Sequence, residues 1–378
     1  MSTIFKKNLI LSVVLSASAF AAHAQSNVTI YGDLDQYLGY IRSSTGNSVT
    51  GINDGSILRS RLGFRGMEDL GNGYQAKFNL EQGLNANSGS SADTTRLFDR
   101  QAWVGMNTPY GEVRLGRQNT LIFYAGDAID YTARTTFGSM INTFGVPSRY
   151  DNDISYQTPR MSGLQLSVHY ALPENATATV NNKALVQLGA DYQNGPYRFG
   201  YAGLEASPNA VTATFTQKVV YHNVYADYDY GQGKIYYAFV RSNNVTGNSS
   251  GNDATAILSN ISNPNNFFPG TDANVNRFYN INQISVDYRV STKLRVGALY
   301  GVIDDTSGGN TGASGGNVGV FYDLSSRTTL YSFANYMKNQ ANAGFRFSGS
   351  AGPSANLSGT DINGKGLTGL QAGILFRF

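Results

Sequence analysis

The chain has no cysteine, so neither a disulfide bond nor a thiolate metal site contributes to its structure. Only 14% of its 378 residues are charged, and 28 basic residues stand against 25 acidic ones, which removes any global electrostatic argument for nucleic-acid binding. No apolar segment reaches the roughly 20 residues that a membrane-spanning helix needs. Histidines are few and carboxylates are scattered, so we expect no metal site and no other cofactor.

The N-terminus has the features of a secretory signal. Lys6 and Lys7 precede a short apolar stretch, and a small-residue cleavage site ends at Ala24. We therefore predict a signal peptide at residues 1–24 and an exported mature chain at residues 25–378. Loss of the two lysines leaves the mature chain with a net charge near +1, so any electrostatic function must depend on local placement of charge.

Glycine and aromatic residues are abundant. The chain carries 43 Gly, 25 Tyr and 20 Phe, but only 41% of its residues are apolar. This balance is typical of strands with aromatic girdles at the membrane interfaces and small residues toward a lumen, rather than of a globular core.

The last twelve residues, 367–378, alternate with a period of two. One face carries Thr368, Leu370, Ala372, Ile374, Phe376 and Phe378. The other face is mostly glycine and polar, with Gln371 and Arg377, and Leu375 is the exception. We expect this strand to close a transmembrane β-barrel, with Phe378 as its closing residue and C-terminal signal.

Period-two segments recur along the whole mature chain, and none of any length has helical periodicity. The sixteen predicted strands are 28–40, 60–66, 74–82, 97–106, 112–117, 153–158, 164–172, 185–193, 197–204, 219–230, 234–241, 280–288, 293–302, 317–322, 328–337 and 368–378. Short turns alternate with long loops between them, as in bacterial outer-membrane barrels. The predicted fold class is all-β, a 16-stranded antiparallel transmembrane β-barrel with both termini on the periplasmic side. A lumen of this width is too wide for side chains to fill, which indicates an aqueous channel.

The long loops differ in composition. Residues 242–277 and 339–364 are rich in Asn, Ser and Gly, and we interpret them as exposed external loops. Residues 118–152 are instead aromatic and partly apolar, so we predict that this third loop folds inward and constricts the lumen. Asp127 and Asp130 lie near its middle, and we expect both to project into the constriction.

Three segments resemble a known family. Residues 60–81 (SRLGFRGMEDLGNGYQAKFNLE), residues 100–105 with 111–118, and residues 149–156 resemble hairpins of the Gram-negative general porins of the neisserial and burkholderial, beta-proteobacterial type. The resemblance covers the whole mature chain. It implies an integral outer-membrane protein, a homotrimer with one pore per subunit, and a third loop folded into the lumen.

Within this family, anion-preferring members carry arginines on the barrel wall opposite acidic groups of the third loop. The resemblance places such a cluster at Arg61, Arg100 and Arg149. Strand alternation supports Arg61, and by the same rule the lumen also receives Arg59, Lys77 and Arg114. Strand alternation predicts that Arg100 faces outward, so a bulge or an early strand start is needed to turn it inward. For Arg149, alternation gives no information.

The predicted function is general diffusion of ions and small hydrophilic solutes, with a weak preference for anions. The expected partners are other copies of the chain, outer-membrane lipid with lipopolysaccharide, and the solutes themselves. The alternative is a substrate-specific channel for a sugar or an aromatic or organic acid, with Tyr31, Tyr37, Tyr221 and Tyr225 on inner faces. A structural or adhesive barrel is a third possibility.

We do not expect an enzyme. Only His169 and His222 remain after removal of the signal, and alternation places the first in the lumen and the second on the outer face.

Overall fold

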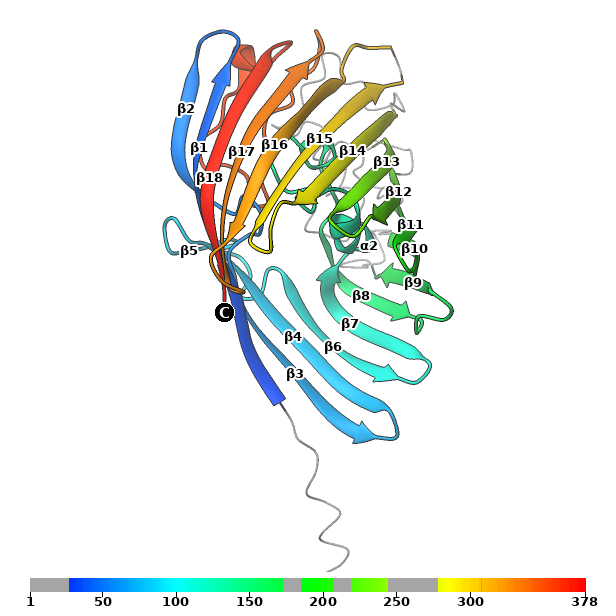
Figure 1. Cartoon of the computed structure of the whole chain (residues 1–378). Helices are drawn as coiled ribbons and strands as arrows, with labels where there is room; N and C mark the ends of the chain where they lie inside the picture. The colour runs from blue at the N-terminus through cyan, green and yellow to red at the C-terminus, as the bar shows by residue number, and fades with distance from the viewer. Residues whose placement is uncertain (1–26, 173–184, 207–218, 244–277, 307) are drawn as a thin grey trace, which may run out of the picture.

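The chain forms a ring of antiparallel strands that closes on itself (Figure 1). A computed structural model describes residues 27–172, 185–206, 219–243, 278–306 and 308–378. The predicted signal peptide and nearly all of the predicted external loop 242–277 lie outside the described residues.

Eighteen strand elements occupy sixteen positions around the ring. They are β1 (Asn27–Ser43), β2 (Ser48–Asp54), β3 (Arg61–Gly71), β4 (Tyr74–Asn85), β5 (Ser90–Ser91), β6 (Gln101–Thr108), β7 (Gly111–Asn119), β8 (Arg149–Gln157), β9 (Leu164–Ala171), β10 (Leu185–Asn194), β11 (Tyr197–Ala206), β12 (Val219–Asp229), β13 (Lys234–Ser242), β14 (Tyr279–Arg289), β15 (Leu294–Asp305), β16 (Ala313–Asp323), β17 (Thr328–Asn339) and β18 (Gly366–Arg377). β2 and β3 share one position, because both pair with β1, one after the other. β5 is a two-residue strand that pairs only with β4. The chain is thus the predicted 16-stranded antiparallel barrel.

The first and last strands close the ring. β1 pairs with β18 from Asp33 opposite Arg377 to Ser43 opposite Leu367. Beyond this ladder, the backbones of Gly32 and Phe378 exchange two hydrogen bonds of 3.1 and 3.0 Å. A Cβ at Gly32 would lie 2.4 Å from Phe378 Cζ, so glycine at this position leaves room for the terminal ring. The prediction that the terminal strand closes the barrel is confirmed.

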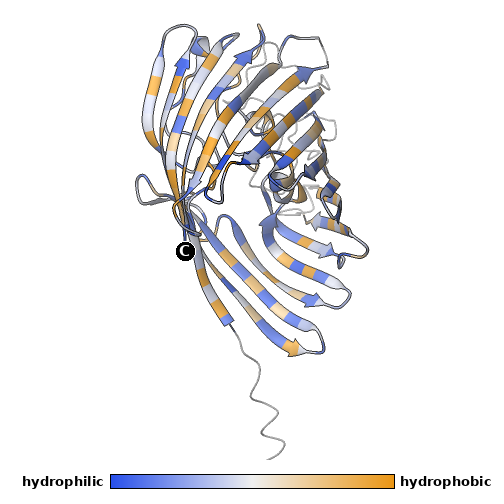
Figure 2. Ribbon diagram, in the orientation of Figure 1, coloured by the Kyte–Doolittle hydropathy of each residue, from blue (hydrophilic) through white to orange (hydrophobic). Residues whose placement is uncertain are grey.

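Apolar and polar residues alternate along the strands, as the banding in Figure 2 shows. On β1, the side chains of Ile30, Leu34 and Leu38 are exposed, whereas Asp35 and Tyr37 between them are buried. The outer surface is therefore apolar and the inner surface polar, which suits a barrel surrounded by lipid.

The second barrel strand is interrupted, which the sequence did not reveal. Residues 55–60 leave the ladder between β2 and β3 and turn inward. The buried carboxylate of Asp35 accepts hydrogen bonds from the backbone N–H groups of Ile57 and Leu58, at 2.7 and 2.8 Å. The predicted strand 60–66 corresponds to β3, and β2 was missed.

Helical segments are short and lie in the loops: α2 (Leu121–Tyr124), η2 (Ala125–Ala128), α3 (Met140–Phe144) and η4 (Gly359–Asp361). In the part of the chain that the structure describes, no helix has the length and apolar character needed to cross a membrane.

Candidate functional site

The third loop lies against the inner face of β14 to β18. One wall side chain that binds it is charged, since Arg295 of β15 donates to the backbone oxygen of Tyr131 at 3.1 Å. The others on these strands are neutral: Gln283, Ser285, Asn317, Asn335 and Gln371. Gln283 Oε1 accepts from the backbone N–H of Met140 at 2.8 Å, and Asn317 Oδ1 accepts from the hydroxyl of Tyr131 at 2.6 Å. A Cβ at Gly297 of β15 would lie 2.3 Å from the Tyr131 ring, so this glycine allows the loop to approach the wall. The loop therefore occupies part of the lumen, and we call residues 120–148 the constriction loop.

Asp130 holds this loop together and does not face the open channel. Its side chain is 1% exposed. Its carboxylate accepts hydrogen bonds from the backbone N–H groups of Thr132 and Arg134 and from the side chains of Thr132, Ser139 and Gln283. The expectation that Asp130 projects into the constriction is wrong, because its carboxylate is buried and these donors offset the cost of removing it from water.

Asp127 is the more exposed of the two acids. Its side chain is 68% exposed, and Oδ2 lies 3.1 Å from the guanidinium of Arg198 on β11. Arg198 is held on its other side by Asp191, at 2.8 Å. Asp127 thus faces water but belongs to a network of charges on the wall.

The last loop, between β17 and β18, also packs inside the mouth of the barrel. Phe347 is 1% exposed and stacks on Phe137 of the constriction loop, with ring centroids 5.2 Å apart. The side-chain amide of Asn142 donates to the backbone oxygen of Ser348 at 2.8 Å. The expectation that residues 339–364 form an exposed loop is wrong, because scattered apolar side chains among the Ser, Gly and Asn residues are buried.

The constriction loop, the last loop, part of residues 92–100 and the adjoining ends of β7 and β8 line a cavity of about 680 Å³. Six arginines line it: Arg59, Arg100, Arg117, Arg134, Arg149 and Arg346. Only two acidic residues, Asp93 and Asp99, are among its lining residues in the described part of the chain. We call this cavity the arginine chamber.

Arg134 and Arg149 lie over the ring of Phe123, with their guanidinium carbons 4.8 and 4.9 Å from its centroid. Arg149 is 9% exposed, and within the described residues its Nε and Nη2 atoms have no hydrogen-bond partner. Arg134 Nη2 donates to the backbone oxygen of Phe123 at 2.7 Å. Cation–π contact holds both groups in place without neutralising their charge.

Arg100 and Arg61 are paired with acids. Arg100 Nε lies 2.6 Å from Glu81 Oε1, and Arg61 Nε lies 2.6 Å from Asp33 Oδ2. Arg61 is also 3.9 Å from Glu81 and does not line the chamber. Arg100 precedes the first residue of β6, so strand alternation does not constrain it. For Arg100 to turn inward within the predicted strand, a bulge or an early strand start was needed, but the strand starts later than predicted, at Gln101.

Lys77 and Arg114 do not line the chamber. Both contact Glu112 near the short turns, Lys77 at 2.6 Å, and Arg114 also lies over the ring of Trp103 at 4.4 Å. Of the basic residues predicted for the constriction, the structure brings together Arg59, Arg100 and Arg149 in the chamber.

Arg117, Arg134 and Arg346 were missed by sequence reasoning. The register of β7 against β8 shifts between Gly116 and Gln118, which turns Arg117 from the expected outer face into the chamber. The other two lie in loops, where alternation gives no information. Burial lowers the pKa of the Arg134 and Arg346 guanidinium groups, but arginine stays protonated at neutral pH.

Two of the four tyrosines named for the alternative, substrate-specific channel pack against the constriction loop. Tyr37 packs edge-on against Phe137, with centroids 5.8 Å apart, and Tyr221 packs against Phe144 at 6.4 Å. These rings face the lumen as expected, but they anchor the constriction loop.

The two histidines have local partners. His169 Nδ1 lies 2.6 Å from Asp153 Oδ2, and His222 Nδ1 lies 2.8 Å from the hydroxyl of Tyr201 on the outer face. Among the described residues, no three His, Asp or Glu side chains are grouped in a way that could hold a metal ion.

Comparison with known proteins shows which family and which structures the chain resembles. A family described as "Gram-negative porin" matches residues 11–342. The chain is 29% identical over 373 residues to an outer membrane porin protein of Bordetella pertussis, covering 89% of this chain and 95% of the relative. Its fold resembles that of an anion-selective porin from Comamonas acidovorans, with a TM-score of 0.75, 23% identity, and coverage of 94% and 100% of the two chains. An outer membrane protein of Vibrio cholerae in its trimer form gives a TM-score of 0.60 at 15% identity, covering 93% of this chain and 99% of that one.

Proposed function

The chain belongs to the Gram-negative porin family, and we propose that its channel passes anions in preference to cations. As an integral outer-membrane porin, it lets ions and small hydrophilic solutes diffuse through a water-filled barrel. The family is one of channel proteins. The preference for anions, in contrast, depends on the particular side chains of this protein.

The observation that carries the proposal is the unequal charge of the arginine chamber. Six guanidinium groups line it against two carboxylates. Two of the six are paired with acids, Arg100 with Glu81 and Arg117 with Asp151, each at 2.6 Å. Arg149 and Arg134 instead lie over the ring of Phe123, which holds them in place but carries no net charge to neutralise theirs.

Electrostatics gives the size of the effect. A charge roughly 8 Å from a passing monovalent ion contributes about 2 kcal/mol at an effective dielectric constant of about 20. Salt screens the contribution over a Debye length of about 8 Å at physiological ionic strength. Several such charges around one passage raise the local anion concentration and lower that of cations, which is how charged rings select ions in channels.

The constriction loop makes the chamber effective because it narrows the lumen beside the arginines. Its anchoring to β14–β18, mostly through neutral side chains, leaves the arginine side of the lumen free for solutes. We infer that Arg59, Arg134, Arg149 and Arg346 set the selectivity, and that Asp127 on the opposite part of the loop moderates it.

We also infer a homotrimer and a cleaved signal peptide at residues 1–24. The solved trimer form of the Vibrio cholerae protein supports the first, and the Lys6-Lys7 pair with its apolar stretch supports the second. Lipid and lipopolysaccharide would then contact the exposed apolar face of strands such as β1.

The direct test is reconstitution of the purified protein in a planar lipid bilayer under a KCl gradient. We expect large conductance steps in groups of three and a reversal potential on the chloride side. A reversal potential on the potassium side would refute the anion preference, and single steps without grouping would refute the trimer.

A further inference from the structure

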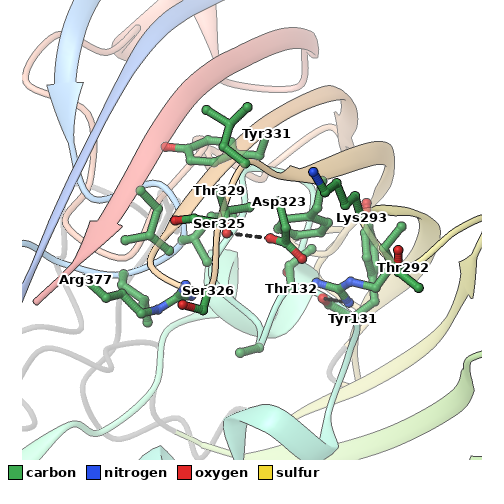
Figure 3. Close-up of a pocket in the computed structure, with 17 residues that line it drawn as sticks. Tyr131, Thr132, Thr292, Lys293, Asp323, Ser325, Ser326, Thr329, Tyr331 and Arg377 are labelled. Atoms are coloured by element: carbon green, nitrogen blue, oxygen red, sulfur yellow. Dashed lines mark hydrogen bonds between the residues drawn. The ribbon is translucent and has the colours of Figure 1, made fainter.

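A second cavity, of about 730 Å³, lies on the side of the constriction loop that faces the short turns (Figure 3). Residues 131–133 of the loop line it, whereas the next residue, Arg134, lines the arginine chamber. Its other walls include residues 292–293 and 323–326 at two short turns. The constriction loop thus lines both cavities, and the second lies toward the short-turn end of the barrel.

The floor of the second cavity is apolar. Ile57, Tyr131, Phe321 and Leu375 line it, and each is less than 10% exposed. Leu375 is the apolar exception in the terminal strand, at an inward position where its neighbours on the same face are Gly373 and Arg377. Leu58 and Leu324, which also line the cavity, are more exposed than these four. Together these side chains give an apolar solute group a surface to bind inside an otherwise polar channel.

The rim of the cavity is basic. Lys293 and Arg377 lie on opposite sides of it in Figure 3. The carboxylate nearest to Arg377 is that of Asp33, 3.8 Å from its Nε, which is too long for a hydrogen bond. Within the described residues, no ion-pair partner is found for the ammonium group of Lys293. Both cations can therefore turn toward a bound anion.

The remaining charged groups of the cavity are already engaged. Arg295 contacts Asp287 at 2.7 Å and stacks on Phe321, with its guanidinium carbon 4.1 Å from the ring centroid. Asp323 accepts a hydrogen bond of 2.7 Å from Thr329, drawn as the dashed line in Figure 3. The lining thus combines three cations and one carboxylate with an apolar floor.

We propose that this cavity is a binding site for small aryl carboxylates, of which benzoate is the simplest. The ring packs on Phe321 and Leu375, and the carboxylate binds between Lys293 and Arg377. This inference rests on the proposed function, because the arginine chamber is what delivers anions to the site. It adds a chemical preference that charge alone does not give, since an aliphatic anion of equal charge gains nothing from the apolar floor.

The test is single-channel recording of the trimeric protein in the presence of benzoate or acetate at equal ionic strength, added on the side of the short turns. Benzoate should reduce the conductance saturably, and acetate should not. Lys293→Gln should raise the half-saturating benzoate concentration at least roughly threefold, since it removes one of the two uncommitted cations. Leu375→Ser should also raise the half-saturating benzoate concentration, because it removes part of the apolar floor.

Lys338→Gln is the matched control, because Lys338 is an exposed lysine of β17 away from the cavity, and it should leave the benzoate effect unchanged. Lys293 is exposed at a turn, so its variant remains informative if Leu375→Ser does not assemble. Equal effects of benzoate and acetate, or an unchanged half-saturation in Lys293→Gln, would overturn the site. The reversal potential under KCl, recorded on the same membranes, separates this result from a failure of the proposed anion preference.

Discussion

The inner surface of the barrel has two unlike sides. From β3 to β8 the wall is charged, and its ionic side chains include Arg61, Glu81, Arg100, Arg117 and Arg149. From β14 to β18 the side chains that bind the constriction loop are amides, a serine and one arginine, Arg295. The first side contributes arginines to the arginine chamber, whereas the second holds the loop and lines the second cavity.

This difference has a physical reason. A loop packed on a wall buries backbone N–H and C=O groups, and each needs a hydrogen-bond partner. Amide side chains both donate and accept, so they satisfy such groups without the cost of burying a charge. The loop therefore docks mainly through neutral side chains, and the arginines of the other wall are left to face the water-filled passage.

Removing charge from the arginine side should have the largest effect. We expect the combined substitution of Arg59, Arg134, Arg149 and Arg346 by glutamine to lower the chloride-to-potassium permeability ratio roughly tenfold, equivalent to about 1.4 kcal/mol. Reversal potentials measure this directly. Lys338→Gln on the outer face serves as the control, and an unchanged ratio in the quadruple variant would contradict the role of the chamber.

Removing the last loop should widen the passage. Deletion of residues 346–356 removes the stack of Phe347 on Phe137 and the lining from Arg346 to Asn356. We expect the single-channel conductance to rise about twofold, because a pore of larger diameter conducts more. Arg346→Gln alone should change selectivity but not conductance, and a deletion variant with unaltered conductance would show that the last loop does not limit flow.

Weakening the hydrogen bonds that hold the constriction loop should make the channel current noisier and leave the barrel intact. Asp130→Asn replaces a buried acceptor of five hydrogen bonds with a group that accepts fewer, at a cost of about 1–3 kcal/mol to the packing of the loop. We expect increased open-channel noise, with trimer resistance to heat in detergent unchanged because the strand ladders remain. Quiet channels in this variant would exclude Asp130 as an anchor.

Asp127→Asn should have the smallest effect. The carboxylate is exposed and lies 3.1 Å from Arg198, so salt screens much of its field. Its removal should strengthen the anion preference less than about twofold. A shift toward potassium would mean that the substitution moved the loop rather than only its charge.

The sequence was sufficient to predict the barrel and, for many strand residues, which side of the wall they face. Alternation places Leu370 and Ile374 on the outer face and Gln371 on the inner face, because a strand between lipid and water allows no other arrangement. The same rule could not place Arg117, which a bulge at Gly116 turns inward, or Arg100, which lies just before its strand.

The last loop was mispredicted for a different reason. Its Ser, Gly and Asn content is typical of exposed segments, and Phe345, Phe347 and Leu357 are too irregularly spaced to indicate a buried face. Their burial depends on contacts with the constriction loop and the inward turn at residues 55–60, which are distant in the chain. Arg346 could not be assigned to the chamber without those contacts.

The most direct test compares two variants of the same chamber under one KCl gradient. Arg149→Gln removes a charge that has no carboxylate partner among the described residues, whereas Arg100→Gln combined with Glu81→Gln removes a cation and its 2.6 Å partner together. We predict that the reversal potential moves toward potassium in Arg149→Gln and stays at the wild-type value in the paired variant. Equal shifts in both, or no shift in Arg149→Gln, would contradict the claim that uncompensated arginines select the anions.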